Sequence, residues 1–402
     1  MLQFFSASTG IVNSRRAMRE CLEIALEGQP NLDCDLIIFH TAMGHNFNEL
    51  LSEARKLAPG AQIAGCTGAG VIGAEGPNQT MKALCIMAIK GPKSEFAVTA
   101  VESWEKKDPK EVAAGLSRNL HQLKPDTRMI LVYPSAIGIL PADKIIEGIE
   151  SVFGSDIPVF GGNAIDNIKA VSCFQFFNDT IIENGAIMIG FSDPTLKLFG
   201  QANHGMKVMK EMPFEATKAE SNLIFELNGQ PAWKIIAKTL DIPESTPWPE
   251  YGMLAFLAEE VPEPFQDALG EDYIMNLIYG DPETGVLICN RTVRQGSYYC
   301  LAKRDEELMF QGVDHMTHRI SGHLGGIQPV AVFHADCSIR GRMSFNRVLK
   351  DEIVSRMQYP ICQGQKIPWL GFYSGGEFSH IGGKNIFNIF TTTLNVLYRN
   401  DE

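Results

Sequence analysis

The sequence predicts an α/β chain of the mixed α+β type, in two packed domains with mixed or antiparallel sheets. Short apolar runs such as 36–39 and 129–133 alternate with longer stretches of helical periodicity, which indicates alternating strands and helices. Each strand–helix–strand unit is followed by closely spaced further strands, which a doubly wound parallel sheet would not need. The length of 402 residues is also more than one domain usually holds. We therefore expect repeated β-α-β-β units.

The same order of elements recurs along the chain. In the first unit we expect helix 14–28, strand 36–39, helix 47–57, strand 62–64, the Gly-rich stretch 65–73 and strands 83–89 and 96–101. In the second we expect strand 129–133, a helix opened by Pro141, strand 158–160 running into the Gly-rich stretch 161–167, and strands 174–177 and 186–191. In the third we expect strand 330–333 ending in HADC (334–337), a helix from Ser344 to Ile353, strand 369–373 ending in SGGE (374–377), and one long strand 386–397.

The domain boundary is expected near residue 229. Asn228 and Gly229 form a turn signal, and Pro231 is suited to the start of a helix. The predicted domains are therefore 1–229, with two of the repeated units, and 230–402. Because no long flexible linker separates them, we expect the two halves to pack against each other.

Composition excludes several classes of partner. The net charge is −12, and no run of Lys and Arg supplies a phosphate-binding surface, so we expect no nucleic-acid partner. No apolar stretch reaches the ~18 residues of a membrane span, so we expect no membrane insertion. The start of the chain lacks the pattern of a signal peptide, and its 9 cysteines form no CxxC motif. We expect a cytoplasmic protein with reduced thiols.

The segment Gly68-Ala-Gly70-Val-Ile-Gly73 matches the GxGxxG pattern of dinucleotide sites. That pattern needs a helix directly after it, because the pyrophosphate binds free helix N–H groups. A turn and another strand follow here instead. We therefore favour a tight turn, with a pocket for a small anion as a further alternative.

The strand exit around Cys337 carries the strongest chemical signal. His334 precedes this cysteine and Arg340 follows it, at a strand end where α/β folds often place ligands. A thiol beside an arginine could be nucleophilic, which keeps a cysteine-dependent hydrolase or transferase as an alternative. Arg340 is a candidate anion clamp and Glu377 a candidate amine acceptor, which together would suit a zwitterion. The structural alternative is that Arg340 and Glu377 merely pair with each other.

The pair His315 and His318 has helical spacing and would suit a metal ion, but no acidic or Cys ligand completes the set nearby. We favour a structural role for it and predict no metal site.

Polar or Gly-rich residues follow four of the apolar strands, at 65–70, 161–166, 334–341 and 371–377. Buried strands carry polar groups poorly, so we expect these exits to line one or two concave sites. The predicted ligand-binding residues are Thr67, Asn163, Cys337, Arg340, Gly341, Tyr373 and Glu377.

These motifs resemble a known family. GCTGAGVIG (65–73) and FGGNAIDN (160–167) are similar to the strand exits of the FIST N domain. FHADCSIRGR (333–342) and WLGFYSGGEFSHIGG (369–383) are similar to the hallmarks of the FIST C domain. The resemblance implies an intracellular sensory module that binds a small ligand, such as an amino acid, and signals through a separate partner such as a histidine kinase or a cyclic-dinucleotide enzyme.

The resemblance also leaves alternatives open. Some stand-alone FIST proteins are haem proteins that sense nitric oxide, and His204 and His380 are the axial candidates in this chain. The leading expectation is a binding protein without chemistry of its own and without a cofactor. The haem sensor is the second hypothesis, and the enzyme that uses Cys337 is the third.

Overall fold

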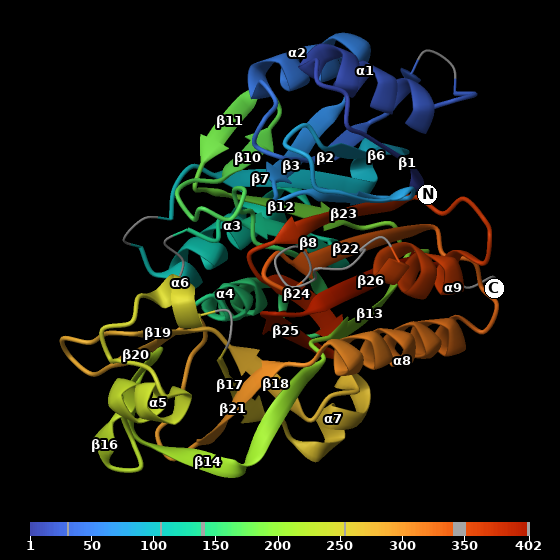
Figure 1. Ribbon diagram of the computed structural model, residues 1–402. Coiled ribbons are helices and arrows are strands. Elements are labelled where there is room, and N and C mark those ends of the chain that lie inside the picture. Colours follow the sequence, from blue (N-terminus) through green and yellow to red (C-terminus); the bar gives the residue numbers. More distant parts are fainter. Residues whose placement is uncertain (30–31, 105–106, 138–140, 253–254, 341–350, 400–402) are drawn as a thin grey trace.

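A computed structural model describes the chain except for residues 30–31, 105–106, 138–140, 253–254, 341–350 and 400–402. It has two parts (Figure 1). The larger part is a core of three six-stranded sheets, and the smaller part is an eight-stranded sheet with short helices, which lies below the core in the figure. The smaller part, residues 206–304, is called the insert here, because the chain leaves the core to form it and then returns.

Within the described residues, the core consists of one unit repeated three times, as predicted, but strand 96–101, which was expected in the first unit, opens the second copy. The first copy comprises β1 (Gln3–Thr9), α1 (Ser14–Ala25), β2 (Leu36–Thr41), α2 (Phe47–Leu57), β3 (Gln62–Thr67), the hairpin β4 (Val71–Gly73) and β5 (Gly76–Asn78), and β6 (Leu84–Lys90). The second comprises β7 (Phe96–Val101), α3 (Pro109–Leu123), β8 (Met129–Pro134), α4 (Lys144–Phe153), β9 (Val159–Gly162), the hairpin β10 (Phe174–Phe177) and β11 (Thr180–Glu183), and β12 (Ala186–Phe191).

The third copy is interrupted by the insert. It comprises β13 (Lys197–Asn203), α8 (Glu306–Leu324), β22 (Ala331–Cys337), the π-helical segment η3 (Asp351–Gln358) with α9 (Tyr359–Cys362), β23 (Trp369–Ser374), the hairpin β24 (Glu377–Ile381) and β25 (Lys384–Asn388), and β26 (Thr392–Tyr398). Between β13 and α8 the chain forms β14 (Met206–Glu220), β15 (Leu223–Leu227), β16 (Gln230–Pro231), α5 (Ala232–Leu240), α6 (Trp248–Tyr251), β17 (Phe256–Glu260), α7 (Glu263–Leu269), β18 (Tyr273–Asn276), β19 (Ile278–Gly280), β20 (Leu287–Cys289) and β21 (Tyr298–Arg304).

The hairpin of each copy pairs with a strand of another copy. The hairpin β4–β5 of the first copy pairs with β23 of the third, β10–β11 of the second pairs with β3 of the first, and β24–β25 of the third pairs with β9 of the second. The three exchanges form a closed cycle. Strands from both predicted domains therefore share sheets, and the predicted division at residue 229 falls between β15 and α5, inside the insert.

The sheets are mixed, as predicted. In each copy the two strands joined by a helix are parallel, namely β2–β3, β8–β9 and β22–β23. Their other partners in the core sheets are antiparallel. The GxGxxG stretch runs into strand β4 and not into a helix. A Cβ at Gly70, where φ is +150°, would lie 2.9 Å from the carbonyl oxygen of Asn78, so this glycine serves a tight turn.

The prediction of one long strand over 386–397 was wrong, because β25 and β26 belong to different sheets and the chain must turn between them. Phe390 takes a φ of +58° at that turn. The helix expected from Ser344 falls largely on 341–350, outside the described residues, and its last member, Ile353, lies in η3. In the second copy α4 begins at Lys144, just after the predicted Pro141.

Candidate functional site

The strand exits of the three copies meet at one place. In each parallel pair a glycine lies at the same register position: Gly65 opposite Phe39, Gly161 opposite Val132 and Gly371 opposite His334. The residues two positions later are Thr67, Asn163 and Tyr373, so these predicted residues are structural equivalents. A ring of three backbone hydrogen bonds joins them, from Ile165 N to Thr67 O (3.2 Å), from Gly375 N to Asn163 O (2.9 Å) and from Ala69 N to Tyr373 O (2.9 Å).

Glycines allow this close approach. A Cβ at Gly68 would lie 2.9 Å from the ring of Phe372, and a Cβ at Gly162 would lie 3.0 Å from the same ring. Both distances are shorter than ordinary van der Waals contact. The Gly-rich exits that the sequence analysis singled out are therefore needed to bring three strand ends together.

The three equivalent side chains differ in their surroundings. Thr67 Oγ1 accepts a hydrogen bond from the backbone N–H of Phe174 at 2.9 Å, so this hydroxyl supports the exchanged hairpin. Asn163 Oδ1 is buried and has no hydrogen-bond partner in the part of the chain that the structure describes. Tyr373 is fully buried, its hydroxyl lies 3.5 Å from Gln79 Nε2, and burial raises its pKa. In the third copy, the charged side chains of Asp336, Arg340 and Glu352 lie near these three strand exits.

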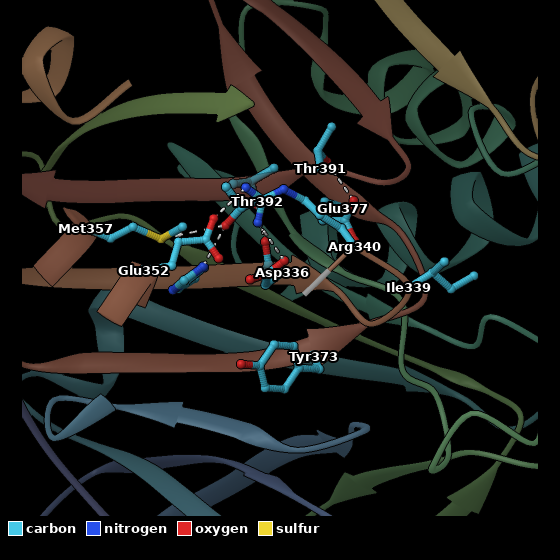
Figure 2. Close-up of polar contacts among 12 residues, drawn as sticks. Asp336, Ile339, Arg340, Glu352, Met357, Tyr373, Glu377, Thr391 and Thr392 are labelled. Carbon is cyan, nitrogen blue, oxygen red and sulfur yellow. Dashed lines mark hydrogen bonds and ion pairs between the residues drawn. The ribbon is translucent and has the colours of Figure 1, made fainter. Parts of the chain in front are cut away.

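These charges form a buried cluster at the exit of β22. The Nη1 of Arg340 lies 3.4 Å from Asp336 Oδ1, and its Nη2 lies 2.7 Å from Glu352 Oε1. Figure 2 shows the guanidinium between the two carboxylates, with Tyr373 on the neighbouring strand. All three ionic side chains are at most 1% exposed. Burial by itself would lower the pKa of Arg340, but Glu352 and Asp336 raise it above its usual value, so the guanidinium stays charged.

Glu377 is a third buried carboxyl group beside this ion pair network. Its Oε1 accepts a hydrogen bond from Ser374 Oγ and its Oε2 accepts one from Thr391 Oγ1, both at 2.7 Å. Burial raises the pKa of Glu377 to about 8, against the effect of the two hydroxyls, and the nearby charge of Asp336 adds to the rise. Burial likewise raises the pKa of Asp336 to about 7, with Arg340 lowering it and Glu352 raising it. Both carboxyls therefore titrate near neutral pH.

Five buried polar atoms of this region have no hydrogen-bond partner among the described residues. They are Asp336 Oδ2, Ser338 Oγ, Arg340 Nε, Glu352 Oε2 and His334 Nδ1. Buried polar groups are normally paired, because an unpaired one costs about 1–3 kcal/mol, and more if it is charged. We call Asp336, Ser338, Arg340, Glu352 and Glu377 the strand-exit cluster.

Sequence reasoning missed three members of this cluster. Asp336 and Ser338 lie in the segment HADCSIR, inside a motif that was quoted for its cysteine and arginine. Glu352 lies next to Ile353 and is 1% exposed. An acidic residue beside the apolar face of a predicted helix was the signal that would have found it, because unpaired acids are rarely buried.

Cys337 and His334 do not form a catalytic pair in this geometry. Three residues apart on β22, they project to opposite faces of the strand. Burial raises the pKa of the Cys337 thiol well above its usual value, and the charge of Glu377 raises it further, so the thiol stays protonated. His334 Nε2 lies 2.8 Å from Thr392 Oγ1, and burial lowers the pKa of this imidazole to about 3.

Gly341, a predicted ligand-binding residue, lies outside the described residues. Arg340 is engaged by Asp336 and Glu352, which is neither the free anion clamp nor the direct pair with Glu377 that the sequence suggested as alternatives. The cluster thus brings Arg340, Tyr373, Glu377 and Cys337 to one strand exit, and their role in binding stays a prediction.

The haem candidates do not provide a fitting site. His204 uses both ring nitrogens: Nδ1 accepts from the N–H of Met206 at 2.8 Å, and Nε2 lies 3.1 Å from Tyr273 O and 3.3 Å from Glu271 Oε2. The cavity that His204 lines is about 10 Å³, room for about one water molecule and not for a porphyrin. His380 lies on β24 with its Nδ1 2.8 Å from Asn385 Oδ1, away from that cavity.

Comparisons with known proteins support a family assignment. The chain is 23% identical over 287 residues to the uncharacterized protein Mb0898c of Mycobacterium bovis, covering 69% of this chain and 67% of that protein. It is 22% identical over 354 residues to the uncharacterized protein Rv0628c of Mycobacterium tuberculosis, covering 86% of each. A crystal structure of cyanuric acid hydrolase from A. caulinodans aligns over both whole chains with a TM-score of 0.37 and 8% identity, and a second cyanuric acid hydrolase structure aligns with a TM-score of 0.31 and 9% identity.

Models of protein families give the clearest match. The model of the FIST N domain matches residues 35–230, and the model of the FIST C domain matches residues 232–380. These domains are associated with small-ligand sensing in signal transduction. Among the residues that the structure describes, no helix has the length and apolar character needed to cross a membrane. With both domains matched in order along its length, the chain belongs to the FIST family.

Proposed function

We propose that this chain is a cytoplasmic sensory protein that binds a small polar ligand, such as an amino-acid-like molecule, at the strand-exit cluster. Binding is its whole activity, and the signal passes to a separate partner protein such as a histidine kinase or a cyclic-dinucleotide enzyme. The proposal joins what is known of FIST domains to the one place where the strand exits of all three copies meet.

The observation that carries this proposal is the set of unpartnered polar atoms in the cluster. Asp336 Oδ2 and Glu352 Oε2 belong to the two carboxylates that contact Arg340, and Ser338 Oγ is buried just beyond the end of β22. A folded protein keeps such groups only where something satisfies them or where function requires them. A polar ligand that reaches the exit would supply the missing hydrogen bonds.

The state of Cys337 favours binding over covalent chemistry. A nucleophilic cysteine needs an accessible thiolate, usually beside a base or a cation that lowers its pKa. Cys337 is fully buried with a raised pKa, and His334 lies on the other face of the strand. The cluster therefore suits recognition of a ligand better than attack on one.

A thermal-shift screen of the full chain tests the proposal. The panel contains the protein L-amino acids, their 2-hydroxy acid counterparts, and simple amines such as putrescine and agmatine. A ligand that binds only the folded state raises the melting temperature in a saturable way, with a stabilisation of about 2.7 kcal/mol at one hundred times Kd. We expect such a rise for at least one chemical class. A melting temperature that no compound changes would contradict a sensor of this ligand type.

A further inference from the structure

We infer that the strand-exit cluster recognises a protonated amine of its ligand, and not a carboxylate. This inference rests on the proposed function and narrows it to a ligand class. It concerns the group of the ligand that enters the cluster, whatever the rest of the molecule is.

The charge balance of the cluster is the first support. Asp336 and Glu352 contact the guanidinium of Arg340, and Glu377 is a third carboxyl group near Asp336. Among the described residues, Arg304 is a second cation near Arg340. His334 is the nearest imidazole on the same strand and is neutral at physiological pH. An anionic group would bring a fourth acid into a buried site where the described residues supply two cations, which low-dielectric surroundings strongly disfavour. A cation would restore the balance.

The hydrogen-bonding needs of the cluster are the second support. Two of the unpartnered atoms, Asp336 Oδ2 and Glu352 Oε2, are carboxylate oxygens, and a third, Ser338 Oγ, can accept as well. Each terminal nitrogen of Arg340 already donates to one of the protein's own carboxylates, and only its Nε–H is a buried donor without a partner among the described residues. An alkylammonium group carries three N–H donors, which match three unpartnered acceptors in number and in charge.

A metal ion is the other cation that carboxylates attract. Within the described residues, no group of three or more His, Cys, Asp and Glu side chains has an arrangement that could hold one. The guanidinium of Arg340 between Asp336 and Glu352 also repels a dication at the place where two carboxylates would bind it. An organic ammonium carries a single charge and directs its donors, which suits this site better.

Binding of an ammonium group competes with protons. The carboxyl of Asp336 faces Arg340 and Glu352, Tyr373 lies opposite it on the paired strand β23, and the carboxyl of Glu377 on β24 interacts electrostatically with it. Since burial raises the pKa of Asp336 to about 7, this carboxyl is mostly ionised at pH 8 and mostly protonated at pH 6. The affinity for an amine should therefore fall about tenfold from pH 8 to pH 6, whereas the affinity for an anion should rise or stay constant.

The experiment compares matched ligands by isothermal titration calorimetry of the full chain at pH 8. Each amine that stabilises the protein is tested against the analogue that carries a hydroxyl in place of the ammonium group, such as L-alanine against L-lactate or γ-aminobutyrate against 4-hydroxybutyrate. We expect the amine of the binding pair to bind at least tenfold more tightly. MgCl2 and CaCl2 without organic ligand serve as metal probes.

Variants connect the binding to the cluster. Asp336→Asn and Glu352→Gln should each weaken amine binding at least tenfold, and the milder Ser338→Ala, which removes one acceptor and no charge, should weaken it several-fold. The matched control is Asp126→Asn, which removes the same charge from a surface ion pair with Lys124 and should change the affinity less than twofold. Ser338→Ala keeps the test valid if the two charge variants fail to fold.

The outcomes separate the inference from the function on which it rests. If hydroxy acids bind as tightly as their amines, or if Mg²⁺ or Ca²⁺ stabilises the chain and amines do not, the sensor stands and the amine inference is overturned. If amines bind and Ser338→Ala leaves their affinity unchanged, the amine site lies elsewhere and the inference is also overturned. If no compound of either class binds, the proposed function itself fails.

Discussion

The first and third copies of the repeated unit have the same parallel strand pair and opposite chemistry at its exit. In the first copy Thr41 pairs with Thr67, and both hydroxyls are satisfied: Thr41 Oγ1 donates to Ala83 O at 3.2 Å and Thr67 Oγ1 accepts from Phe174 N–H. In the third copy the corresponding pair is Asp336 and Tyr373, and Asp336 keeps an unpartnered oxygen.

The fold determines where the strand exits lie, and the side chains at each exit determine whether its hydrogen bonds are satisfied. The exchange of hairpins brings three strand exits together in the same way, because the register and the glycines are shared. The hydroxyls of Thr41 and Thr67 at the exit of the first copy are satisfied, whereas Asp336 at the equivalent position of the third copy leaves an acceptor open. Function is therefore expected where the repeat departs from complete satisfaction of its hydrogen bonds.

Removing the guanidinium of Arg340 from the strand-exit cluster should have the largest effect on stability. Arg340→Met leaves Asp336 and Glu352 buried without a counter-charge, and breaking a buried pair in this way costs about 3–5 kcal/mol. Urea unfolding measures the loss. The combined variant Arg340→Met with Asp336→Asn and Glu352→Gln should recover most of it. Equal losses in the single and the combined variants would contradict a charge-based explanation.

Alanine at equivalent glycines should affect the two copies unequally. A Cβ at Gly65, where φ is +153°, would lie 2.0 Å from the carbonyl oxygen of Phe39, whereas at Gly371 it would lie 2.9 Å from both Cβ and the carbonyl oxygen of His334. We expect Gly65→Ala to cost about 3 kcal/mol or more and Gly371→Ala about 1–2 kcal/mol, since the steric overlap is larger at Gly65 and its positive φ adds strain. Denaturant midpoints of the two variants measure the order, and a larger loss at Gly371 would be the wrong order.

Buried titratable groups of both copies make the stability of the protein depend on pH. Burial lowers the pKa of His40 in the first copy and of His334 in the third to about 3, below the 6.5 of an exposed imidazole. These groups stabilise the fold above pH 6.5 and lose that contribution as the pH falls toward 3. Asp336 and Glu377 have raised pKa values of about 7 and 8, so their contribution is present below about pH 4 and is lost as the pH rises to 8.

The two effects oppose each other between about pH 4 and 6.5, and each acts alone outside that window. We expect the stability that these groups control to be nearly constant within it, to fall below it because of the histidines, and to fall from pH 6.5 to 8 because of the carboxyls, by up to about 1.4 kcal/mol per pH unit and group. Thermal melts across this range measure the profile. Asp336→Asn should remove the part of the alkaline limb that belongs to this carboxyl and leave the part due to Glu377 and the acid limb, and an unchanged alkaline limb would contradict the assignment.

The smallest contrast compares two hydroxyls. Thr67→Val removes the acceptor for the Phe174 N–H and should cost about 1 kcal/mol in stability without changing ligand affinity. Ser338→Ala should do the reverse, because Ser338 Oγ has no partner within the described protein to lose. Chemical unfolding and calorimetry on both variants provide the comparison. A loss of ligand affinity in Thr67→Val would move the site toward the first copy.

Much of the fold could be predicted from the sequence, because hydrophobic periodicity is local. The apolar run 96–101 and the helix 47–57 were placed at their observed bounds. The hairpin exchange was not predictable, since short strands such as Val71–Gly73 carry no signal of which sheet they join. For the same reason the run 386–397 was taken as one strand, although its two parts belong to different sheets.

The candidate site was predictable to the same degree. The Gly-rich and polar exits showed which strand ends would meet, because glycine and unpaired polar groups are unusual beside buried strands. The partners of Arg340 could not be assigned, because Asp336 precedes it on the strand and Glu352 lies on a helical segment that follows undescribed residues. Only the packed structure shows that the arginine is held by the protein's own acids.

The central claim, that the third copy carries the ligand site, is tested most directly by hydrogen–deuterium exchange with the amine that stabilises the protein most. We predict slower exchange on ligand addition in peptides that cover the end of β22, η3 and the start of β24, with the exits of β2 and β3 in the first copy changed less. Protection confined to the first copy or to the insert, with the third copy unchanged, would contradict the account.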